Sequence, residues 1–473
     1  SKIKVSSNVN YCNYLLMNVL NRNINNIFFI FLFLNLIVWT LIPSLTNKNL
    51  PLDTIEALAW GSNLDWGFNK HPPFSAFAVN VFYNIFGSRD WAYYLLSQIF
   101  VLIAFISIFK LGIEIFRDKT LAFLSILILE SIFFYNYTSP EFNVNISQLP
   151  FWALSILFTW RCAKNDKLID YILLGIFLGL GFLSKYIFLY LVLGIVFFYT
   201  YLIFNKKLKS INFLITPLIA LLIIFPHLIW LAENNLVTLK YGIQRTGADK
   251  NILNHIIFPV SFIAKQLGIL IPFFIMSFFL VRKIRIKNIT FNEKIVFLNF
   301  TFIVPIVLVI VTSLLIGGNI RTMWMTPFYL LSGIMLIQIF RKNIVLKKLR
   351  GFFIVFLFFF FLSPSAYIVV SLKNDFKRTD YQGKEIARLV QNKWNDNFSN
   401  DIKIVVGDEW FAGNLSYHLS SRPKWLSELK NNMTILNDDK GVIYTGNPKI
   451  LKKICPGVYG TIKPVGYCMI GRR

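Results

Sequence analysis

Residues 27–43 read IFFIFLFLNLIVWTLIP, and this apolar stretch is long enough to cross the hydrocarbon core of a membrane. No cleavage site with small residues follows it, so we expect it to remain as an anchor instead of being removed as a signal peptide. The whole chain agrees, because 56% of its 473 residues are hydrophobic and only 15% are charged. In soluble proteins nearer a quarter of the residues are charged. The sequence therefore predicts a polytopic α-helical membrane protein.

Further apolar runs of about 20 residues follow along the chain. Together they predict eleven transmembrane helices: 25–46, 91–111, 120–137, 148–161, 169–184, 187–204, 211–232, 255–280, 293–315, 323–340 and 351–372. We expect one membrane module, 25–372, between a cytoplasmic N-terminal segment, 1–24, and an outer C-terminal domain, 373–473.

The basic residues predict the orientation of these helices. If the N-terminus lies in the cytoplasm, the inner segments hold 22 Lys and Arg residues and the outer loops of the membrane module hold 8. Cytoplasmic loops are enriched in basic residues, so we expect this orientation. The net charge of +25 has the same origin. Because the basic residues are spread over short loops and form no nucleic-acid-binding motif, we expect no nucleic-acid partner.

The C-terminal part of the chain is more polar, and its patterns change. The runs DIKIVVGD (401–408) and GVIYTG (441–446) predict strands, and YQGKEIARLVQNKW (381–394) has the spacing of a helix. We therefore expect a small outer α/β domain. Cys455 and Cys468 lie in it, and we expect a disulfide between them in an oxidising compartment, the alternative being two free thiols. The sequence has no CxxC pattern, and no cluster in it indicates a metal site.

The first outer loop contains the densest cluster of ionisable groups in the sequence. Its segment DTIEALAWGSNLDWGFNKHPPF (53–74) begins with Asp53 and Glu56, which a helix would place on one face. Lys70 and His71 follow, directly before two prolines. Transfer of a group from a lipid phosphate needs such a pair of charges. The carboxylate would accept or orient the proton of the acceptor, and the cation would hold the phosphate leaving group.

The same loop has features that suit the surface of a membrane. Residues 54–60 and 74–86 predict short amphipathic helices in the interface. Trp60 and Trp66 offer aromatic surfaces on which a sugar would stack. The alternative interpretation is a solvated loop whose charges only mark the topology of the chain.

The segment 53–74, with SRDWAYYLL at 88–96, resembles the first outer loop of the GT-C glycosyltransferases of family 39. This family includes the protein O-mannosyltransferases and the bacterial transferases that add aminoarabinose or galacturonic acid to lipid A. The resemblance extends in order over most of the chain, through SPEFNVNISQLPFWAL (139–154), GLGFLSKYIFLYLVLG (179–194), PHLIWLAENNLVTLKY (226–241) and GDEWFAGNLSYHLSSRP (407–423). The branch of lipid A galacturonosyltransferases is the most similar.

The resemblance implies roles for several residues of the first two outer loops. Asp53 falls on the catalytic acidic position and Lys70 on the lysine before the prolines. Beside them, Glu56 is a second catalytic candidate, and His71 joins Lys70 as a candidate for binding the donor phosphate. Many members of the family carry an Asp in the second outer loop. This chain has none there, and Glu141, Asn143 and Asn145 are the candidates for that substrate-binding position.

Three further basic residues are candidates for binding the donor phosphate. The resemblance gives this role to Lys185, beside Tyr186, the alternative being a lysine that reaches the outer interface. Lys265 lies within a predicted span, where a lysine is costly unless it is paired or faces water, and the equal alternative is a lysine near the outer end of a helix. Arg321, in GGNIRTMW, lies in an outer loop and would bind a phosphate, although an ordinary loop arginine is an equal alternative.

Together these features predict an integral-membrane glycosyltransferase in the inner membrane of a bacterium, with its C-terminal domain in the periplasm. Its donor would be a polyprenyl-phosphate sugar, and its acceptor a lipid A type or other glycan or lipid at the periplasmic face. The sequence has no nucleotide-binding motif and requires no cofactor. The alternative is a transporter or flippase of a lipid-linked saccharide, which would share the basic cavity but predicts broken helices and pseudo-symmetric halves.

Overall fold

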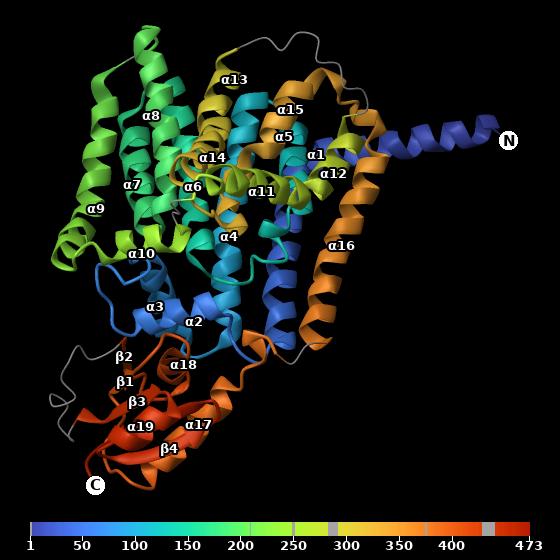
Figure 1. Ribbon diagram of the computed structural model, residues 1–473. Helices are drawn as coiled ribbons and strands as arrows, with labels where there is room; N and C mark the ends of the chain where they lie inside the picture. The colour runs from blue at the N-terminus through green and yellow to red at the C-terminus, as the bar shows by residue number, and fades with distance from the viewer. Residues whose placement is uncertain (1, 209, 248–250, 282–291, 374–375, 428–439) are drawn as a thin grey trace.

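The chain forms a helical bundle with a small sheet domain at one end, and two short helices lie between these parts (Figure 1). The computed structural model describes residues 2–208, 210–247, 251–281, 292–373, 376–427 and 440–473. The first helix, α1 (Lys2–Thr46), changes direction at Asn23, whose backbone is not helical, and from there runs through the bundle.

Six helical segments of the described residues are long and apolar enough to cross a membrane. They are Asn23–Thr46 of α1, α4 (Asp90–Phe116), Tyr186–Phe204 with α8 (Leu189–Phe204), Ile211–Glu233 with α9 (Ile215–Glu233), Glu293–Ile316 with α13 (Glu293–Leu298) and α14 (Val304–Ile316), and α16 (Arg350–Lys373). The pair α11 (Asn254–Ile269) and α12 (Ile271–Leu280), bent by 50°, makes a seventh if it forms one span. The predicted class of membrane protein is confirmed, whereas the predicted number of eleven spans is not.

The other four predicted spans are helical but shorter, interrupted or more polar. α5 (Lys119–Leu127) ends in 3₁₀ turns, and α15 (Ser332–Phe340) follows such turns. α7 (Leu168–Ser184) has only 17 residues. α6 (Val144–Asn165) is buried along most of its length and carries polar side chains such as Gln148 and Thr159. An apolar run in the sequence does not reveal whether the helix continues or which neighbours cover it, so counting such runs does not separate these segments from true spans.

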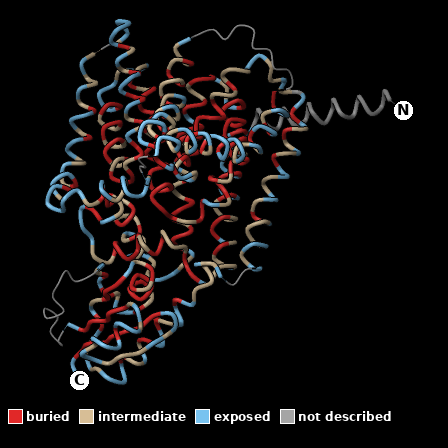
Figure 2. Tube along the Cα trace, viewed as in Figure 1, coloured by how far each residue is buried: buried red, intermediate tan, exposed pale blue. Residues whose placement is uncertain are grey.

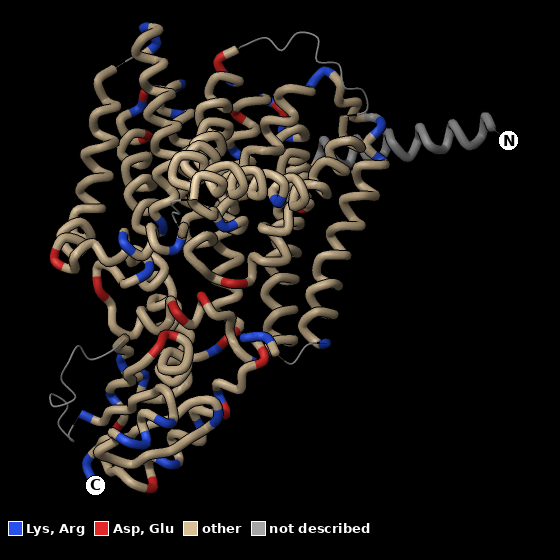
Figure 3. The backbone as a smooth tube through the Cα atoms, viewed as in Figure 1, with Lys and Arg blue, Asp and Glu red and all other residues tan. Residues whose placement is uncertain are grey.

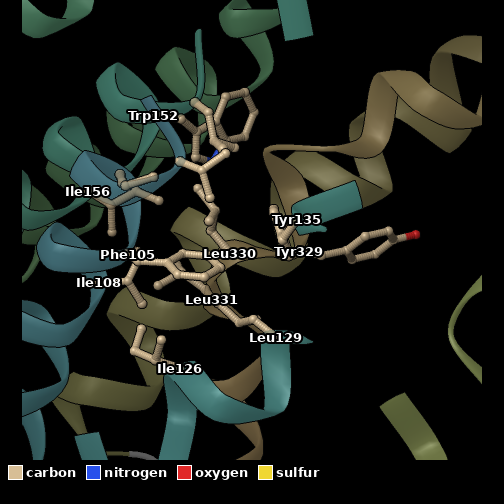
Figure 4. Close-up of a cluster of buried hydrophobic side chains, with 14 of the residues drawn as sticks. Phe105, Ile108, Ile126, Leu129, Tyr135, Trp152, Ile156, Tyr329, Leu330 and Leu331 are labelled. Carbon is tan, nitrogen blue, oxygen red and sulfur yellow. The ribbon is translucent and has the colours of Figure 1, made fainter. Parts of the chain in front are cut away.

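The centre of the bundle is a core of large apolar side chains from α4, α5, α6 and the turns beside them. Figure 4 shows part of it, with Phe105, Ile108, Ile126, Leu129, Tyr135, Trp152, Ile156, Tyr329, Leu330 and Leu331 labelled. α15 can approach α5 closely because Gly333 has no side chain. A Cβ at this position would collide with the carbonyl oxygen of Ser125. Burial is concentrated in these inner helices, and outer helices such as α9 and α16 are largely exposed (Figure 2). Apolar residues on α16, including Phe358 at 58% exposed, indicate a surface that faces lipid.

Two short helices of the first loop separate the bundle from the sheet domain. They are α2 (Leu52–Gly61) and α3 (Phe74–Phe86), close to the helices predicted at 54–60 and 74–86. α2 contacts α3 on one side and α18 (Phe411–His418) of the sheet domain on another. The proposal that Trp60 offers a sugar-stacking surface is wrong, because Trp60 is only 2% exposed and its ring stacks on Phe68.

The C-terminal domain contains a five-stranded sheet in the order β2-β1-β3-β5-β4. Its strands are β1 (Ile404–Val406), β2 (Lys424–Leu426), β3 (Val442–Gly446), β4 (Val458–Ile462) and β5 (Val465–Ile470). β2, β1 and β3 are parallel, whereas β5 and β4 are antiparallel. The predicted strands coincide with β1 and β3, and the predicted helix with α17 (Gly383–Asn395). The predicted α/β class of this domain is therefore confirmed.

A disulfide links two segments of this domain. Cys455, which follows α19 (Pro448–Ile454), is joined to Cys468 of β5 by a disulfide, with 5.6 Å between the two Cα atoms. The link therefore holds the end of a short exposed helix against a buried strand.

Candidate active site

A cavity of about 580 Å³ lies where the bundle meets the first-loop helices and α10 (Val237–Thr246). Figure 3 shows acidic and basic segments gathered in the region between the bundle and the C-terminal domain. The ionisable and aromatic residues that line the cavity come from segments far apart in the sequence: Asp53, Glu56, Lys70, His71, Lys185, Tyr186, Tyr190, Tyr241, Arg245, Arg321 and Trp324. Asn145 also lines the cavity, so eight of the candidate catalytic and substrate-binding residues, all except Glu141, Asn143 and Lys265, share it.

The helix α2 brings two carboxyl groups to the cavity. Asp53 and Glu56 lie one helical turn apart and both line it. The start of this helix is held by the second loop, because Oε1 of Glu141 accepts a hydrogen bond from the backbone N–H of Asp53 at 3.2 Å. Burial raises the pKa of the Asp53 carboxyl, although the charges of Lys185 and Lys70 oppose this shift. Burial and the charge of Asp53 raise the pKa of Glu141 to about 8.

Lys70 is neutralised by two carboxylates. Its Nζ lies 2.7 Å from Glu56 and 3.3 Å from Glu409, which belongs to the C-terminal domain. Burial lowers the pKa of Lys70, but the hydrogen bonds and charges of its two partners raise it above its ordinary value. Burial raises the pKa of Glu56 to about 7, although the hydrogen bond from Lys70 opposes this shift. Sequence reasoning missed Glu409, although the segment 407–423 that contains it carried part of the family resemblance.

The loop that carries Lys70 is anchored to α9 and α10. Trp230 donates from Nε1 to Asp65 at 2.8 Å, and Thr238 donates to the carbonyl oxygen of Phe68 at 2.7 Å. Nδ1 of His227 lies 2.6 Å from the carbonyl oxygen of Trp66. These contacts fix the loop before it reaches the cavity.

Two further features hold the same region. Tyr186 lines the cavity, and its hydroxyl lies 2.7 Å from Nε2 of His227, so this tyrosine also braces the anchor of the loop. Gly67 packs under the indole ring of Trp230, where a Cβ would collide with the ring. The loop therefore packs tightly against α9 at this position.

His71 lies between the aromatic rings of Trp60 and Tyr241. Burial lowers the pKa of His71 to about 3, and the charges of Lys185, Lys70 and Arg245 act in the same direction. The imidazole is therefore neutral near pH 7, so His71 does not add a positive charge for a phosphate.

Lys185 is the buried basic residue of the cavity, and burial lowers its pKa to about 7 although the charge of Asp53 opposes this shift. It is 6% exposed, donates to Oδ1 of Asn145 at 2.6 Å and lies 4.8 Å from the centre of the Trp324 ring. In the described part of the chain, no carboxylate lies within 4 Å of its Nζ. Arg245 and Arg321 are exposed and line the same cavity. An anion in the cavity would therefore meet one buried cation and two arginines.

Three predicted site residues do not line this cavity. Lys265 is exposed on α11 and lines neither of the two large cavities. Asn143 is the N-cap of α6, because its Oδ1 accepts the backbone N–H groups of Asn145 and Ile146. Glu141 accepts a hydrogen bond from the backbone N–H of Asp53 and does not line the cavity itself. Among the described residues, no group of three or more His, Cys, Asp or Glu side chains is arranged to hold a metal ion.

A second, apolar cavity of about 360 Å³ lies between the bent pair α11–α12, α14 and α15. Its lining is almost entirely aliphatic and aromatic and includes Ile306 and Ile310 of α14. Val309 and Thr312 of the same helix line the charged cavity instead. One helix therefore separates an apolar space from a charged one.

The sequence of the chain is similar to those of known proteins. Residues 70–230 match the family described as dolichyl-phosphate-mannose-protein mannosyltransferase. A curated relative is the lipopolysaccharide core galacturonosyltransferase RgtA of Rhizobium johnstonii, 23% identical over 311 residues, or 63% of this chain. The match spans 60% of the length of that relative.

Two solved structures have a similar fold. ArnT from Cupriavidus metallidurans, bound to undecaprenyl phosphate, matches with a TM-score of 0.64 at 10% identity over 93% of this chain and 97% of ArnT. The apo state of the same protein matches with a TM-score of 0.63 at 11% identity. The resemblance to GT-C enzymes drawn from the motifs is confirmed by these matches: the chain has a fold similar to that of ArnT, and its residues 70–230 match the dolichyl-phosphate-mannose-protein mannosyltransferase family.

Proposed function

We propose that this chain is an integral-membrane glycosyltransferase that moves a sugar from a polyprenyl phosphate to a glycolipid of the lipid A or lipopolysaccharide type. The observation that carries the proposal is the buried Lys185, which has no carboxylate within 4 Å among the described residues and shares a cavity with Asp53. Since burial disfavours the charged form of Lys185, an anion in the cavity would stabilise its ammonium group and keep it protonated. The names of the relatives, a galacturonosyltransferase and a protein bound to undecaprenyl phosphate, support the same chemistry.

In the proposed reaction, the bond between the anomeric carbon of the sugar and the phosphate oxygen breaks. A bond from the acceptor oxygen to the same carbon forms, and the released polyprenyl phosphate keeps the electron pair. Lys185 stabilises the charge that develops on the phosphate, and Arg245 and Arg321 bind its outer oxygens. The family resemblance implies direct attack with inversion at the anomeric carbon.

Asp53 is the proposed catalytic carboxylate. If the acceptor is a hydroxyl group, its proton passes to Asp53, and the raised pKa of this carboxyl makes it a better base. If the acceptor is a phosphate, it is already an anion and Asp53 only orients it. Glu56 lies on the same face of α2 but forms an ion pair with Lys70. It is therefore assigned a supporting role, and Asp53 the role of the catalytic carboxylate.

The apolar cavity is the proposed seat for the first isoprene units of the donor. It contains almost no polar surface, as a hydrocarbon chain requires, and it adjoins the charged cavity across α14. The lipid would thus enter from the membrane between α11, α12 and α14, with its phosphate next to Lys185.

The proposed location is the inner membrane of a bacterium, with the N-terminus in the cytoplasm and residues 373–473 in the periplasm. The distribution of Lys and Arg supports this orientation. The disulfide between Cys455 and Cys468 also suits an oxidising compartment. A single cysteine placed at the exposed Asp401 should react with an impermeant maleimide in intact spheroplasts, and a lack of reaction until the membrane is broken would reverse the orientation.

The function is tested by turnover in a purified system. The full chain in lipid would receive polyprenyl-phosphate sugars and a pool of lipid A acceptors, and mass spectrometry would follow the acceptor and the released polyprenyl phosphate. We expect the acceptor to gain the mass of one sugar for each polyprenyl phosphate released. Transfer of intact donor across the bilayer without any gain in acceptor mass would instead establish the transporter.

The transporter remains the second candidate because of one observation. α11 and α12 form a broken helix with a bend of 50°, a feature that transporters use at their substrate sites. The transporter, however, gives no role to the raised pKa of Asp53 or to its place in one cavity with Lys185.

A further inference from the structure

Glu409 belongs to the C-terminal domain but contacts the loop that lines the cavity. It follows β1, at the carboxyl edge of the parallel part of the sheet. The turn before α18 is fixed, because Oδ1 of Asp408 accepts the backbone N–H groups of Trp410 and Phe411. A Cβ at Gly407 would collide with the hydroxyl of Thr445, so the chain lies close to β3 there. This turn directs Glu409 away from its own domain.

The two oxygens of Glu409 contact two consecutive side chains of the first loop. Oε1 accepts a hydrogen bond from Nδ2 of Asn69 at 3.2 Å, and Oε2 lies 3.3 Å from Nζ of Lys70. On its other side, Lys70 is 2.7 Å from Glu56. The side chains of Lys70, Glu56 and Glu409 are 22%, 13% and 12% exposed, so water screens these charges only in part.

We propose that Glu409 is a positioning residue that holds Lys70 away from the phosphate of the polyprenyl lipid and so speeds the release of this product. The inference rests on the proposed function and deepens it, since it assigns the C-terminal domain a part in the same site. When Glu56 and Glu409 are both ionised, the two carboxylates around one ammonium leave a net charge of −1. A phosphate in the cavity must therefore compete with Glu409 for Lys70, whereas Lys185 has no such competitor among the described residues.

The position of Glu409 is set by how the C-terminal domain is attached. Nη2 of Arg422 donates to the carbonyl oxygen of Leu58, near the end of α2, at 2.6 Å. The backbone N–H of Trp425 donates to the hydroxyl of Ser62 at 2.8 Å. Both contacts join the domain to the helix that carries Glu56. The domain and α2 therefore hold the two partners of Lys70 at a fixed separation.

The test measures binding of undecaprenyl phosphate to the full chain in lipid nanodiscs. Glu409→Gln keeps an oxygen for Asn69 but removes the charge. We expect its Kd to be about threefold to tenfold lower than that of the wild type, because the competing anion is gone. Glu385→Gln is the matched control in the same domain, since Glu385 pairs with Arg388 on the exposed face of α17. Its Kd should equal that of the wild type.

A double-mutant cycle shows whether Glu409 acts through Lys70. Lys70→Gln should raise the Kd, and adding Glu409→Gln to it should change nothing further. Glu409→Asp, which keeps the charge, should bind like the wild type. In turnover, Glu409→Gln should lower both the KM for the donor and kcat, because the product leaves more slowly.

Two failures are distinguishable. If the wild type does not bind undecaprenyl phosphate, the proposed function falls and this inference with it. If the wild type binds, but Glu409→Gln binds equally or more weakly, the inference alone is overturned and Glu409 is only a structural contact. A lower melting temperature together with weaker binding in Glu409→Gln would overturn the inference in the same way.

Discussion

Nζ of Lys185 donates a hydrogen bond of 2.6 Å to Oδ1 of Asn145, and both side chains are buried. An amide oxygen orients an ammonium group but does not neutralise it. Lys70, in contrast, is held by the carboxylates of Glu56 and Glu409. The cavity thus contains one lysine whose charge is available to a ligand and one whose charge is already used. Burial lowers the pKa of Lys185 to about 7, but an anion bound next to it would keep it protonated, and little water would screen the attraction between the two.

Replacing Lys185 by Met should therefore remove most of the affinity for a phosphate. We expect the Kd for undecaprenyl phosphate to rise by about tenfold to a hundredfold, the effect of losing a charged hydrogen-bond donor. Microscale thermophoresis on the detergent-solubilised chain would measure it. Lys265→Met is the matched control, because Lys265 is exposed and lines neither large cavity.

The same variant also reports on folding. Removing Lys185 leaves Oδ1 of Asn145 without its donor but also removes a buried charge, so the two effects on stability oppose each other. The melting temperature should stay within a few degrees of the wild-type value. Unchanged affinity in a folded Lys185→Met chain would remove Lys185 from the phosphate site.

The pKa of Glu56 predicts a pH dependence of activity. Burial raises this pKa to about 7, so the ion pair with Lys70 weakens as the pH falls through that value. We expect kcat/KM to fall on the acid side with an apparent pKa near 7, measured over a pH series with saturating acceptor. In Glu56→Gln, kcat/KM should be low at every pH of the series and should no longer fall on the acid side. An acid limb of the same midpoint in Glu56→Gln would assign it to another group.

Glu56 should also affect stability in a defined direction. Its folded pKa of about 7 exceeds the ordinary value of 4.5, so the folded chain binds more protons than the unfolded chain between these values. The contribution of this group to stability is then complete at low pH and is lost as the pH rises toward 7. Melting temperatures of the wild type and Glu56→Gln across this range should diverge accordingly, and parallel curves would contradict the assignment.

The fit of Gly67 under Trp230 predicts a sensitive position. Gly67→Ala would force a methyl group into the indole ring and displace the loop that carries Lys70. We expect a loss of about 1–3 kcal/mol in stability and a lower kcat/KM. Gly268→Ala is the control, because a Cβ there has open space and lies in a helix, where alanine is favoured. Equal behaviour of the two variants in thermal melts and turnover would show that the loop is not tightly held.

Local patterns in the sequence were enough to predict several elements. The runs 401–408 and 441–446 predicted two strands, β1 and β3, and the spacing in 381–394 predicted α17. The spacing of Asp53 and Glu56 also placed both groups on the cavity side of one helix. These features depend on neighbours within a few residues.

The rest depends on contacts between distant parts of the chain. Glu409 lies 339 residues from Lys70, so no local period indicates their pairing. Trp60 looked like an exposed ring on a short amphipathic helix, but the C-terminal domain covers α2 and buries it. His71 looked like a second cation, but burial beside three basic residues keeps it neutral. Tertiary packing decided each of these cases.

The most direct test of the central claim is the release of polyprenyl phosphate by the purified chain with donor and acceptor present, compared between the wild type and Asp53→Asn. Asp401→Asn, at an exposed site of the C-terminal domain, is the control. We predict that release and acceptor glycosylation fall together by about a thousandfold or more in Asp53→Asn, while binding of undecaprenyl phosphate is retained. Release at the wild-type rate in Asp53→Asn would contradict the claim that this carboxylate drives a transfer reaction in the cavity.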